Sequence, residues 1–340
     1  MPEIQLSKTG KFYRIFYSVT YTTFVPMIRY LKHSEIDFQR WDACIDGAIN
    51  SYVYAYSWYL NIVAGAWDAL VEMEGDDYQR VFPLPFRKKM GVKYVYQPAF
   101  TQQLGLFTRL LKGNEKLSDF IAAIPKDFKL VELNINKYHI PQQQDKLEIK
   151  ENRNIELELS PDYEKLYSGY STNLKRNLKK AAKNKLQLLP QIKPEELIRL
   201  FRENKGEEVK AYSDEDYQRL GRLIYIMLHM NRARIFSVAG PENNLLAAAL
   251  FVEHQGRSIF LFSGLSDEGR EKAAMPFLVD AYIKEYASSS RILDFEGSNN
   301  DNLARFYKSF GAKEYKYYSI RRNTIPLAMQ WVFRLYKTLK

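Results

Sequence analysis

Two carboxylates, Asp294 and Glu296, occupy alternate positions of a short apolar segment that is typical of a β-strand. Because the side chains of a strand alternate between its faces, both acids are expected on the side of Ile292, and Leu293 and Phe295 on the other. Burying two unpaired carboxylates is costly, so this face needs a charged partner, a wet cleft or a substrate. A carboxylate in such a place can take a proton from an acceptor amine as a general base, or can orient that amine.

Glu296 is the stronger candidate of the two, because it lies at the carboxyl end of the strand, where the sites of α/β proteins open. The alternative role is structural. Either carboxylate could pair with Arg291 or Arg305, or accept a hydrogen bond from a backbone N–H. Structural ion pairs are commoner than catalytic acids, so residue type alone favours the structural role.

The elements that would position these acids are a strand, a tight turn, an amphipathic helix and a second strand, over Arg291–Tyr318. Gly297 ends the first strand, and apolar residues at i, i+3, i+4 and i+7 predict a helix that Gly311 terminates. Those apolar residues are Leu303, Phe306, Tyr307 and Phe310. Polar residues ahead of the helix are expected to cap it, namely Ser298, Asn299 and Asn302.

Both halves of the chain carry helix and strand patterns in a similar order, which predicts two related domains facing each other across a cleft. The polar, glutamine-rich stretch Pro141–Arg153 is the best candidate for a linker. We therefore expect an N-terminal domain over residues 27–150 and a C-terminal domain over residues 151–325. Residues 1–26 are expected to form an N-terminal extension. Residues 326–340 predict a basic amphipathic helix, docked on the second domain or on a membrane surface.

The charge balance favours anionic partners, since the 340-residue chain has a formal net charge of +10. Six cations crowd one predicted helix with no acid between them: Lys175, Arg176, Lys179, Lys180, Lys183 and Lys185. Such a run is either a solvated face or an anion site for a phosphate-bearing substrate or an RNA backbone.

The single cysteine, Cys44, excludes an intramolecular disulfide and any zinc site built from several cysteines. The four histidines are scattered without ligand spacing, so no metal site is expected. A reducing compartment, the cytoplasm, is the simplest expectation. No stretch is long and uncharged enough to span a membrane, so we expect no integral membrane association.

Two segments carry a resemblance to a known family. LDFEGSNNDNLARFYKSFGAKEYKYY, ending at Tyr318, and STNLKRNLKKAAKNKL, over Ser171–Leu186, resemble the C-terminal domain of the Fem-type transferases, which have the GNAT fold of N-acyltransferases. The likeness covers most of Asn154–Tyr318, and over the first half it is only general. The resemblance implies an α/β (α+β) protein with two tandem GNAT-like domains, each a mixed central sheet flanked by helices.

The resemblance also implies the chemistry, which is acyl transfer to an amine from a CoA thioester or from an aminoacyl-tRNA. GNAT members that bind acetyl-CoA cradle its pyrophosphate with a glycine-rich loop at a helix N-terminus. The corresponding loop here holds Gly264, Gly269, Arg270 and Lys272 but lacks the compact glycine spacing. This departure puts acyl-CoA binding in doubt. It does not decide between the donors, because Fem-type enzymes, which take aminoacyl-tRNA, also lack that loop.

Further site residues follow from the same resemblance. Tyr307 matches a position where GNAT enzymes often carry a tyrosine that protonates the leaving thiolate, although its place in the apolar stripe favours core packing. Apart from the resemblance, three glutamines of the first half, Gln97, Gln102 and Gln103, could line the cleft from the first domain, or could belong to a polar loop, which is the favoured interpretation. The expected anion-binding residues are Lys175, Arg176, Lys179, Arg270, Lys272 and Arg305.

Two functions of different classes remain open from the sequence. The first is an N-acyltransferase that acts on the amine of a small molecule or precursor, with Glu296 as its base. The second is a non-catalytic protein of the same fold that binds an anionic ligand or nucleic acid through its basic helix, because a fold alone does not specify function.

Overall fold

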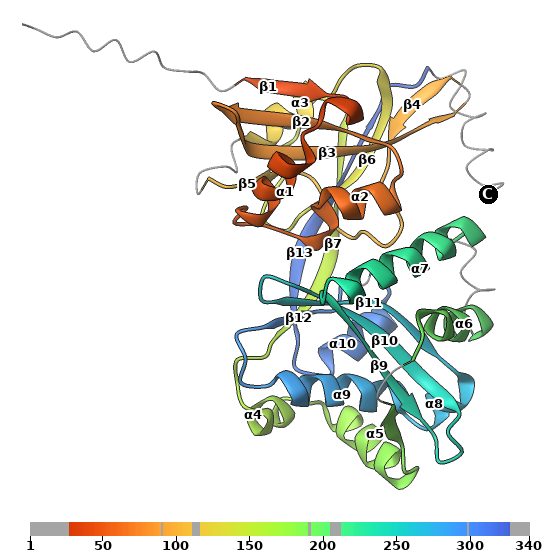
Figure 1. Ribbon diagram of the computed structural model, residues 1–340. Coiled ribbons are helices and arrows are strands. Elements are labelled where there is room, and N and C mark those ends of the chain that lie inside the picture. Colours follow the sequence, from red (N-terminus) through yellow and green to blue (C-terminus); the bar gives the residue numbers. More distant parts are fainter. Residues whose placement is uncertain are drawn as a thin grey trace, which may run out of the picture.

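The computed structural model describes residues 27–89, 91–110, 116–189, 192–204, 212–297 and 299–326 (Figure 1). The expected N-terminal extension, all but the first residue of the expected C-terminal helix, and Ser298 lie outside the described residues. Within the described part, no helix is long and apolar enough to cross a lipid bilayer.

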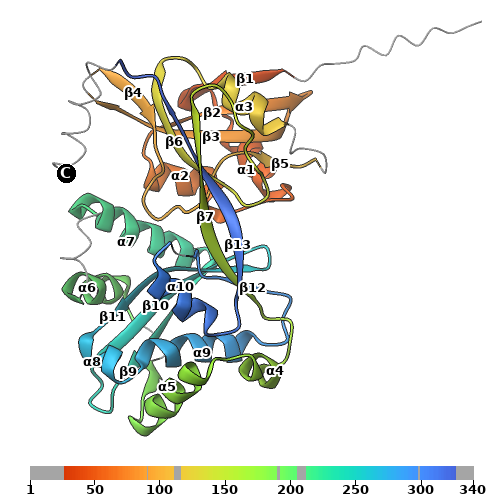
Figure 2. The same cartoon turned by 180° about the vertical axis from the view of Figure 1, so that it is seen from behind.

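A mixed β-sheet runs through both halves of the molecule (Figures 1 and 2). Its strands are β1 (Ile28–Leu31), β2 (Trp67–Glu74), β3 (Asp77–Lys89), β4 (Val92–Val95), β5 (Phe107–Thr108), β6 (Phe128–Ile135), β7 (Leu147–Glu158), β8 (Gln187–Leu189), β9 (Ala233–Ala239), β10 (Leu245–His254), β11 (Arg257–Leu265), β12 (Ile292–Asp294) and β13 (Lys313–Asn323). The hydrogen-bonded order is β1-β2-β3-β4-β6-β13-β7-β12-β11-β10-β9-β8, and β5 pairs with β3. The described sheet is therefore continuous from the first half of the chain to the second.

Helices cover this sheet in both halves. The first half contributes the 3-10 turns η1 (His33–Glu35) and η2 (Val53–Ala55) and the helices α1 (Phe38–Asp46), α2 (Ser57–Val63) and α3 (Leu117–Ala123). The second half contributes α4 (Tyr163–Ser168), α5 (Thr172–Lys183), α6 (Pro194–Asn204), α7 (Asp214–His229), α8 (Asp267–Glu271), α9 (Ala274–Tyr286) and α10 (Asp301–Lys308). Together with the sheet, they give the mixed α/β architecture expected from the sequence.

The hydrophobic core joins the two halves. One cluster of buried side chains extends from the first half, through Tyr54 and Leu60, to Leu220 of α7 and Leu250 of β10. A second cluster lies on the other face of the β9–β12 sheet, under α5, α9 and α10. Because the first cluster is continuous across both halves, they pack directly on one another.

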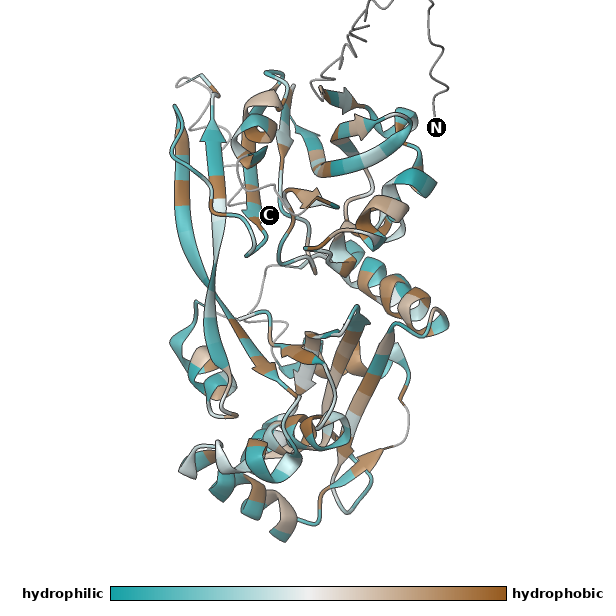
Figure 3. Cartoon of the chain, turned by 90° about the vertical axis from the view of Figure 1, so that its left-hand side faces the viewer, coloured by the Kyte–Doolittle hydropathy of each residue, from teal (hydrophilic) through white to brown (hydrophobic). Residues whose placement is uncertain are grey.

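The strands β7 and β13 form a long antiparallel pair that crosses from one half to the other (Figure 2). The end of β13, Tyr318–Asn323, pairs with β6. The prediction of a linker over Pro141–Arg153 is wrong for residues 147–153, which belong to β7. This crossing pair is largely hydrophilic (Figure 3). Main-chain hydrogen bonds to β13 define residues 147–153 as strand, and their polar composition gives no clear alternation of apolar residues.

The strands β11 and β12 are parallel neighbours for three residues only, from Arg257↔Ile292 to Ile259↔Asp294, and then separate. Phe295 turns toward β7, where its N–H donates to the Ile155 carbonyl at 2.9 Å. Two residues with positive φ follow, Glu296 at 55° and Gly297 at 61°.

Gly297 is required at this turn, because a Cβ built on it would lie 2.2 Å from the Arg153 carbonyl oxygen. The cap of α10 differs from the prediction. Asn300 accepts from the N–H groups of Asn302 and Leu303, whereas the Asn299 side chain bonds to Arg153 and Asn152 of β7.

Candidate active site

A cavity of about 590 Å³ opens where β11 and β12 separate. Aromatic side chains make up much of its wall: Phe201, Tyr212, Phe260, Phe262, Phe295, Phe306 and Tyr307. Its charged lining residues are Lys180, Arg270, Glu271 and Glu296. Lys180, Arg270 and Glu271 are exposed, while Glu296 lies inward, beside the first half of the chain. The cavity is therefore a largely apolar chamber with one carboxyl group on its inner wall.

Glu296 is held from two sides. Its backbone N–H donates to Asp294 Oδ1 at 2.9 Å, and its Oε1 accepts a short hydrogen bond from the Tyr54 hydroxyl. Its other oxygen, Oε2, has no hydrogen bond to any residue that the structure describes. Glu296 thus keeps one carboxyl oxygen available to a molecule in the cavity.

Burial raises the pKa of Glu296 to about 8, and the neighbouring Asp294 charge adds to this rise, whereas the Tyr54 hydrogen bond opposes it. Glu296 is partly exposed on the cavity wall, and protein surrounds it on the remaining sides. A general base works best when its pKa lies near the operating pH. Burial thus brings the pKa of Glu296 into the range in which a general base would operate near neutral pH.

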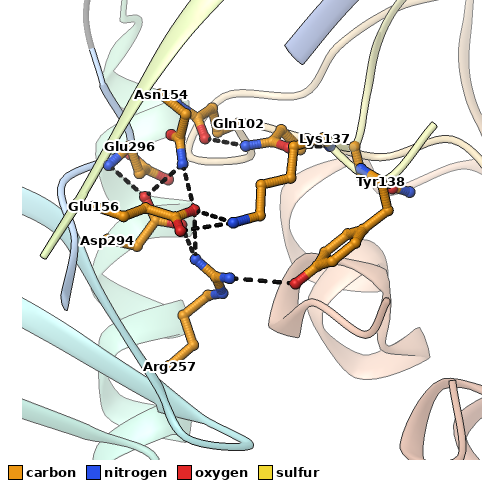
Figure 4. A network of polar contacts seen from close by, with 10 residues as sticks. Gln102, Lys137, Tyr138, Asn154, Glu156, Arg257, Asp294 and Glu296 are labelled. Carbon is orange, nitrogen blue, oxygen red and sulfur yellow. Dashed lines mark hydrogen bonds and ion pairs between the residues drawn. The ribbon is translucent and has the colours of Figure 1, made fainter. Parts of the chain in front are cut away.

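Asp294 belongs instead to a buried ion-pair network (Figure 4). Arg257 Nη1 lies 2.7 Å from Asp294 and 2.8 Å from Glu156, and Lys137 Nζ lies 2.6 Å from Glu156. The Asn154 amide donates to both acids, at 3.1 Å to Asp294 and 2.8 Å to Glu156. Two cations balance two carboxylates here, so Asp294 has a structural role and supports the backbone of Glu296.

The sequence offered a structural alternative for these acids, an ion pair with Arg291 or Arg305. Asp294 does form an ion pair, but with a different arginine. Arg291 pairs with Glu253 at 2.8 Å, and Arg305 is exposed on α10. The partner of Asp294 is Arg257, which lies on the neighbouring strand β11. Sequence spacing within 291–305 could not indicate this pair, because the register between two strands brings it together.

Tyr307 both packs in the core and lines the cavity. Its ring stacks on Phe295 with centroids 4.7 Å apart and an interplanar angle of 17°. Burial raises the pKa of its hydroxyl. That hydroxyl has no hydrogen bond to the described residues, so packing accounts for the position of the ring.

The basic helix α5 reaches the cavity through Asn177 and Lys180. Two of the expected anion-binding residues on it bond locally instead. Lys175 donates to the Ser168 carbonyl at 3.0 Å, and Arg176 donates to Asn173 at 3.1 Å. Lys179 is exposed to solvent. None of the α5 cations has a carboxylate within ion-pair distance among the described residues. The face of α5 thus carries uncompensated positive charge that extends to the cavity mouth.

The loop after β11 does not form a glycine-rich phosphate cradle. A Cβ on Gly264 would lie 2.9 Å from the Phe201 nitrogen, and a Cβ on Gly269 would lie 2.3 Å from the Leu246 carbonyl oxygen. Both glycines therefore allow close packing of the backbone.

The two cations of this loop already have acidic partners. Arg270 lies 3.0 Å from Asp267, and Lys272 lies 2.5 Å from Glu268. With Glu271, the loop carries three carboxylates against two cations. These residues do not fit the pyrophosphate of CoA in the manner that a glycine-rich loop does.

The glutamines expected from the first half have mainly structural contacts. Gln97 donates to the Thr101 carbonyl at 2.7 Å and accepts from the Asn134 N–H at 2.9 Å. Gln102 accepts from the Gln103 amide at 2.6 Å. The first half contributes different residues to the site, above all Tyr54, which the sequence did not single out. The tyrosine-rich run SYVYAYSWY was the available signal, but nothing in it indicates which hydroxyl meets Glu296.

Among the described residues, no group of three or more His, Cys, Asp and Glu side chains is arranged to hold a metal ion. Sequence comparison with protein-family models and with curated proteins gives no match.

Comparison with solved structures gives many matches. The crystal structure of FemX superposes with a TM-score of 0.60 at 12% identity, over 90% of this chain and 99% of that one. A conserved protein of unknown function from Bacteroides thetaiotaomicron gives 0.53 at 8% identity, over 87% and 99%.

The C-terminal domain of a candidate lysylphosphatidylglycerol synthetase from Agrobacterium fabrum gives a TM-score of 0.50 at 10% identity, over 84% of this chain and 92% of that domain. The superpositions establish a shared fold, and at such low sequence identities they establish nothing finer. The expected Fem-type GNAT fold is confirmed.

Proposed function

We propose that this protein is an N-acyltransferase that moves an activated acyl group, such as an aminoacyl group, onto an amine bound in the β11–β12 cavity. The observation that carries the proposal is Glu296, a carboxyl group on the cavity wall with a pKa of about 8 and one oxygen without a partner among the described residues. Ionised carboxylates in proteins are normally paired, so a carboxyl group without a cation, facing a cavity, suits proton transfer.

In this mechanism the acceptor nitrogen lies near Glu296 Oε2 and attacks the carbonyl carbon of the acyl donor. The nitrogen gives a proton to the Glu296 carboxylate as the N–C bond forms. The bond from the carbonyl carbon to the leaving oxygen or sulfur then breaks, and the leaving group takes up the proton that Glu296 received, which returns the carboxylate to its starting state. Among the described strands, β11 has no neighbour on the β12 side after Ile259, so its main-chain N–H groups can polarise the carbonyl oxygen.

In this mechanism the anionic part of the donor binds at the exposed side of the cavity. Lys180 is an exposed lining residue of the cavity, and the exposed face of α5 continues its positive charge outward. The acidic loop after β11 opposes a CoA pyrophosphate at its usual place in this fold. These features favour a donor with an extended polyanionic part, such as an aminoacyl-tRNA, over acyl-CoA.

A ligand screen followed by one substitution tests the proposal. Acyl-CoAs, aminoacyl-tRNAs and small amines are first screened by thermal shift, because a ligand that binds only the native state raises apparent stability. Transfer of a labelled acyl group is then compared in wild type and Glu296→Gln. Loss of a general base lowers turnover by about 10²–10⁴-fold.

Glu158→Gln is the matched control, because Glu158 is exposed at the end of β7, opposite Ile292. We expect wild-type turnover from this control. Unchanged turnover of Glu296→Gln, with a native circular dichroism spectrum, would remove Glu296 from the mechanism. Salt-dependent binding of polyanions with no transfer from any donor would favour a non-catalytic binding protein.

A further inference from the structure

We propose that Tyr54, from the first half of the chain, is a positioning residue for Glu296, whose hydroxyl orients the carboxylate and stabilises its charged form. The inference rests on the proposed function, in which Glu296 is the base. It assigns part of the proton-transfer machinery to a residue 242 positions earlier in the chain. It also makes both halves of the molecule necessary to a site that otherwise lies in the second half.

The contact itself is well defined. Tyr54 lies on the turn η2, is fully buried, and donates its hydroxyl hydrogen to Glu296 Oε1. Burial raises the pKa of Tyr54 well above its ordinary value, so the hydroxyl keeps its proton and acts as a donor. The hydrogen bond therefore favours the ionised carboxylate, which is the stronger acceptor.

The Tyr54 ring is fixed by its neighbours. It stacks on Tyr52 at 5.8 Å with an interplanar angle of 8°, and it meets the edge of Tyr59 at 5.7 Å and 78°. These neighbours are anchored in turn. Tyr59 donates to the Phe100 carbonyl, and the Tyr52 ring lies 5.1 Å from the Arg257 guanidinium. The Tyr54 hydroxyl is thus held at one place by packing that does not involve Glu296.

The charge environment makes this hydrogen bond important. No described lysine or arginine pairs with Glu296, since Arg257 and Lys137 are both committed to Asp294 and Glu156. The titratable groups that surround the carboxylate are Asp294, Tyr54, Tyr59, Tyr212, Tyr307 and Tyr317. Asp294 is the one formal charge in this set and repels a second negative charge. Within the described structure, Tyr54 is the side chain that donates to the carboxylate.

Removing the hydroxyl should therefore make Glu296 harder to ionise. A hydrogen bond to a charged acceptor corresponds to roughly one pKa unit. In Tyr54→Phe we expect the pKa of Glu296 to rise by about one unit, and kcat/KM at pH 7 to fall about tenfold. Activity should recover toward the wild-type value above pH 9. A merely structural defect would lower activity equally at every pH.

The experiment measures two quantities on the full-length protein. The first is the pH profile of kcat/KM. The second is the infrared band of the protonated Glu296 carboxyl, identified by its absence in Glu296→Gln and followed with pH. The control is Tyr52→Phe, because Tyr52 stacks on Tyr54 and its buried hydroxyl has no partner in the described structure. We expect Tyr52→Phe to leave unchanged the midpoint of the pH profile of kcat/KM and the midpoint of the titration of the infrared band.

The infrared titration separates this inference from the proposed function. An unshifted carboxyl band in Tyr54→Phe would overturn the role of Tyr54, whatever the activity. A shifted band with full activity in Glu296→Gln would keep the Tyr54–Glu296 coupling and refute the catalytic role of Glu296. An equal shift in Tyr52→Phe would also overturn the inference, since the effect would then come from packing.

Discussion

The raised pKa of Glu296 predicts that this residue lowers the free energy of unfolding of the protein at neutral and alkaline pH. An unfolded glutamate ionises near its ordinary pKa of 4.5, whereas folded Glu296 ionises near 8. As pH rises between these values, the unfolded state loses its proton and the folded state keeps it, so folding loses stability. Glutamine has no proton to lose and can still accept from Tyr54. Glu296→Gln should therefore be more stable than wild type at pH 8, by an amount that vanishes near pH 4.5.

The magnitude follows from the width of that interval. Each pKa unit corresponds to about 1.36 kcal/mol, so an interval from 4.5 to 8 gives at most about 5 kcal/mol. Water in the cavity screens part of this, and we expect a measured gain of about 2–3 kcal/mol at pH 8. Above pH 8 the gain should stay constant, because both states are then ionised.

Chemical denaturation at several pH values between 5 and 9 measures this gain, provided that the slope m is the same in both proteins. Glu158→Gln is again the control, because an exposed glutamate has no reason to alter the pH dependence of stability. A difference between Glu296→Gln and wild type that does not change with pH would refute the argument, as would a less stable variant at pH 8. Stabilisation together with lost activity is the signature of a group kept for function.

Two further substitutions test the support around the site. Arg257→Met leaves the buried Asp294 and Glu156 without their shared cation, and denaturation should show a loss of about 3–5 kcal/mol, against less than about 0.5 kcal/mol for exposed Arg305→Met. Gly297→Ala places a Cβ against the Arg153 carbonyl and should cost well over the roughly 1 kcal/mol expected for Gly65→Ala. Gly65 also has a positive φ, of 73°, but has open space around it. Equal losses of stability in Arg257→Met and Arg305→Met would contradict the role of the buried ion pairs. Equal losses in Gly297→Ala and Gly65→Ala would contradict the steric requirement for Gly297.

The sequence predicted the parts of the site that depend on local pattern. The apolar spacing of Leu303, Phe306 and Tyr307 predicted α10, and the alternation before it predicted a strand. The expectation that both acids lie on one face of that strand is wrong, because the strand ends at Asp294 and Glu296 follows it with a φ of 55°. Glu296 was preferred to Asp294 because it was expected at the carboxyl end of the strand, where the sites of α/β proteins open. The structure places it two residues beyond that end, on the wall of the cavity. These inferences needed only the periodicities of helix and strand, which a single segment contains.

The contacts that decide the chemistry depend on distant segments. Arg257 meets Asp294 through the register of β11 and β12, and Tyr54 meets Glu296 through the packing of one half on the other. The first part of β7, residues 147–153, was assigned to a linker because its polar residues hide its alternation, although the ladder with β13 defines it. Such information lies in the tertiary structure, and one sequence without relatives does not contain it in readable form.

The two acids show how environment divides roles between identical groups. Asp294 and Glu296 are two residues apart, yet one has Arg257 and Asn154 as partners and the other has a tyrosine hydroxyl and a cavity. The buried network consumes both nearby cations, Arg257 and Lys137, so none remains to hold Glu296 ionised. The ion pairs thus have a second consequence beyond stability. By compensating part of the Asp294 charge they limit its repulsion of Glu296, so the pKa of Glu296 rises less than an unpaired Asp294 would make it rise.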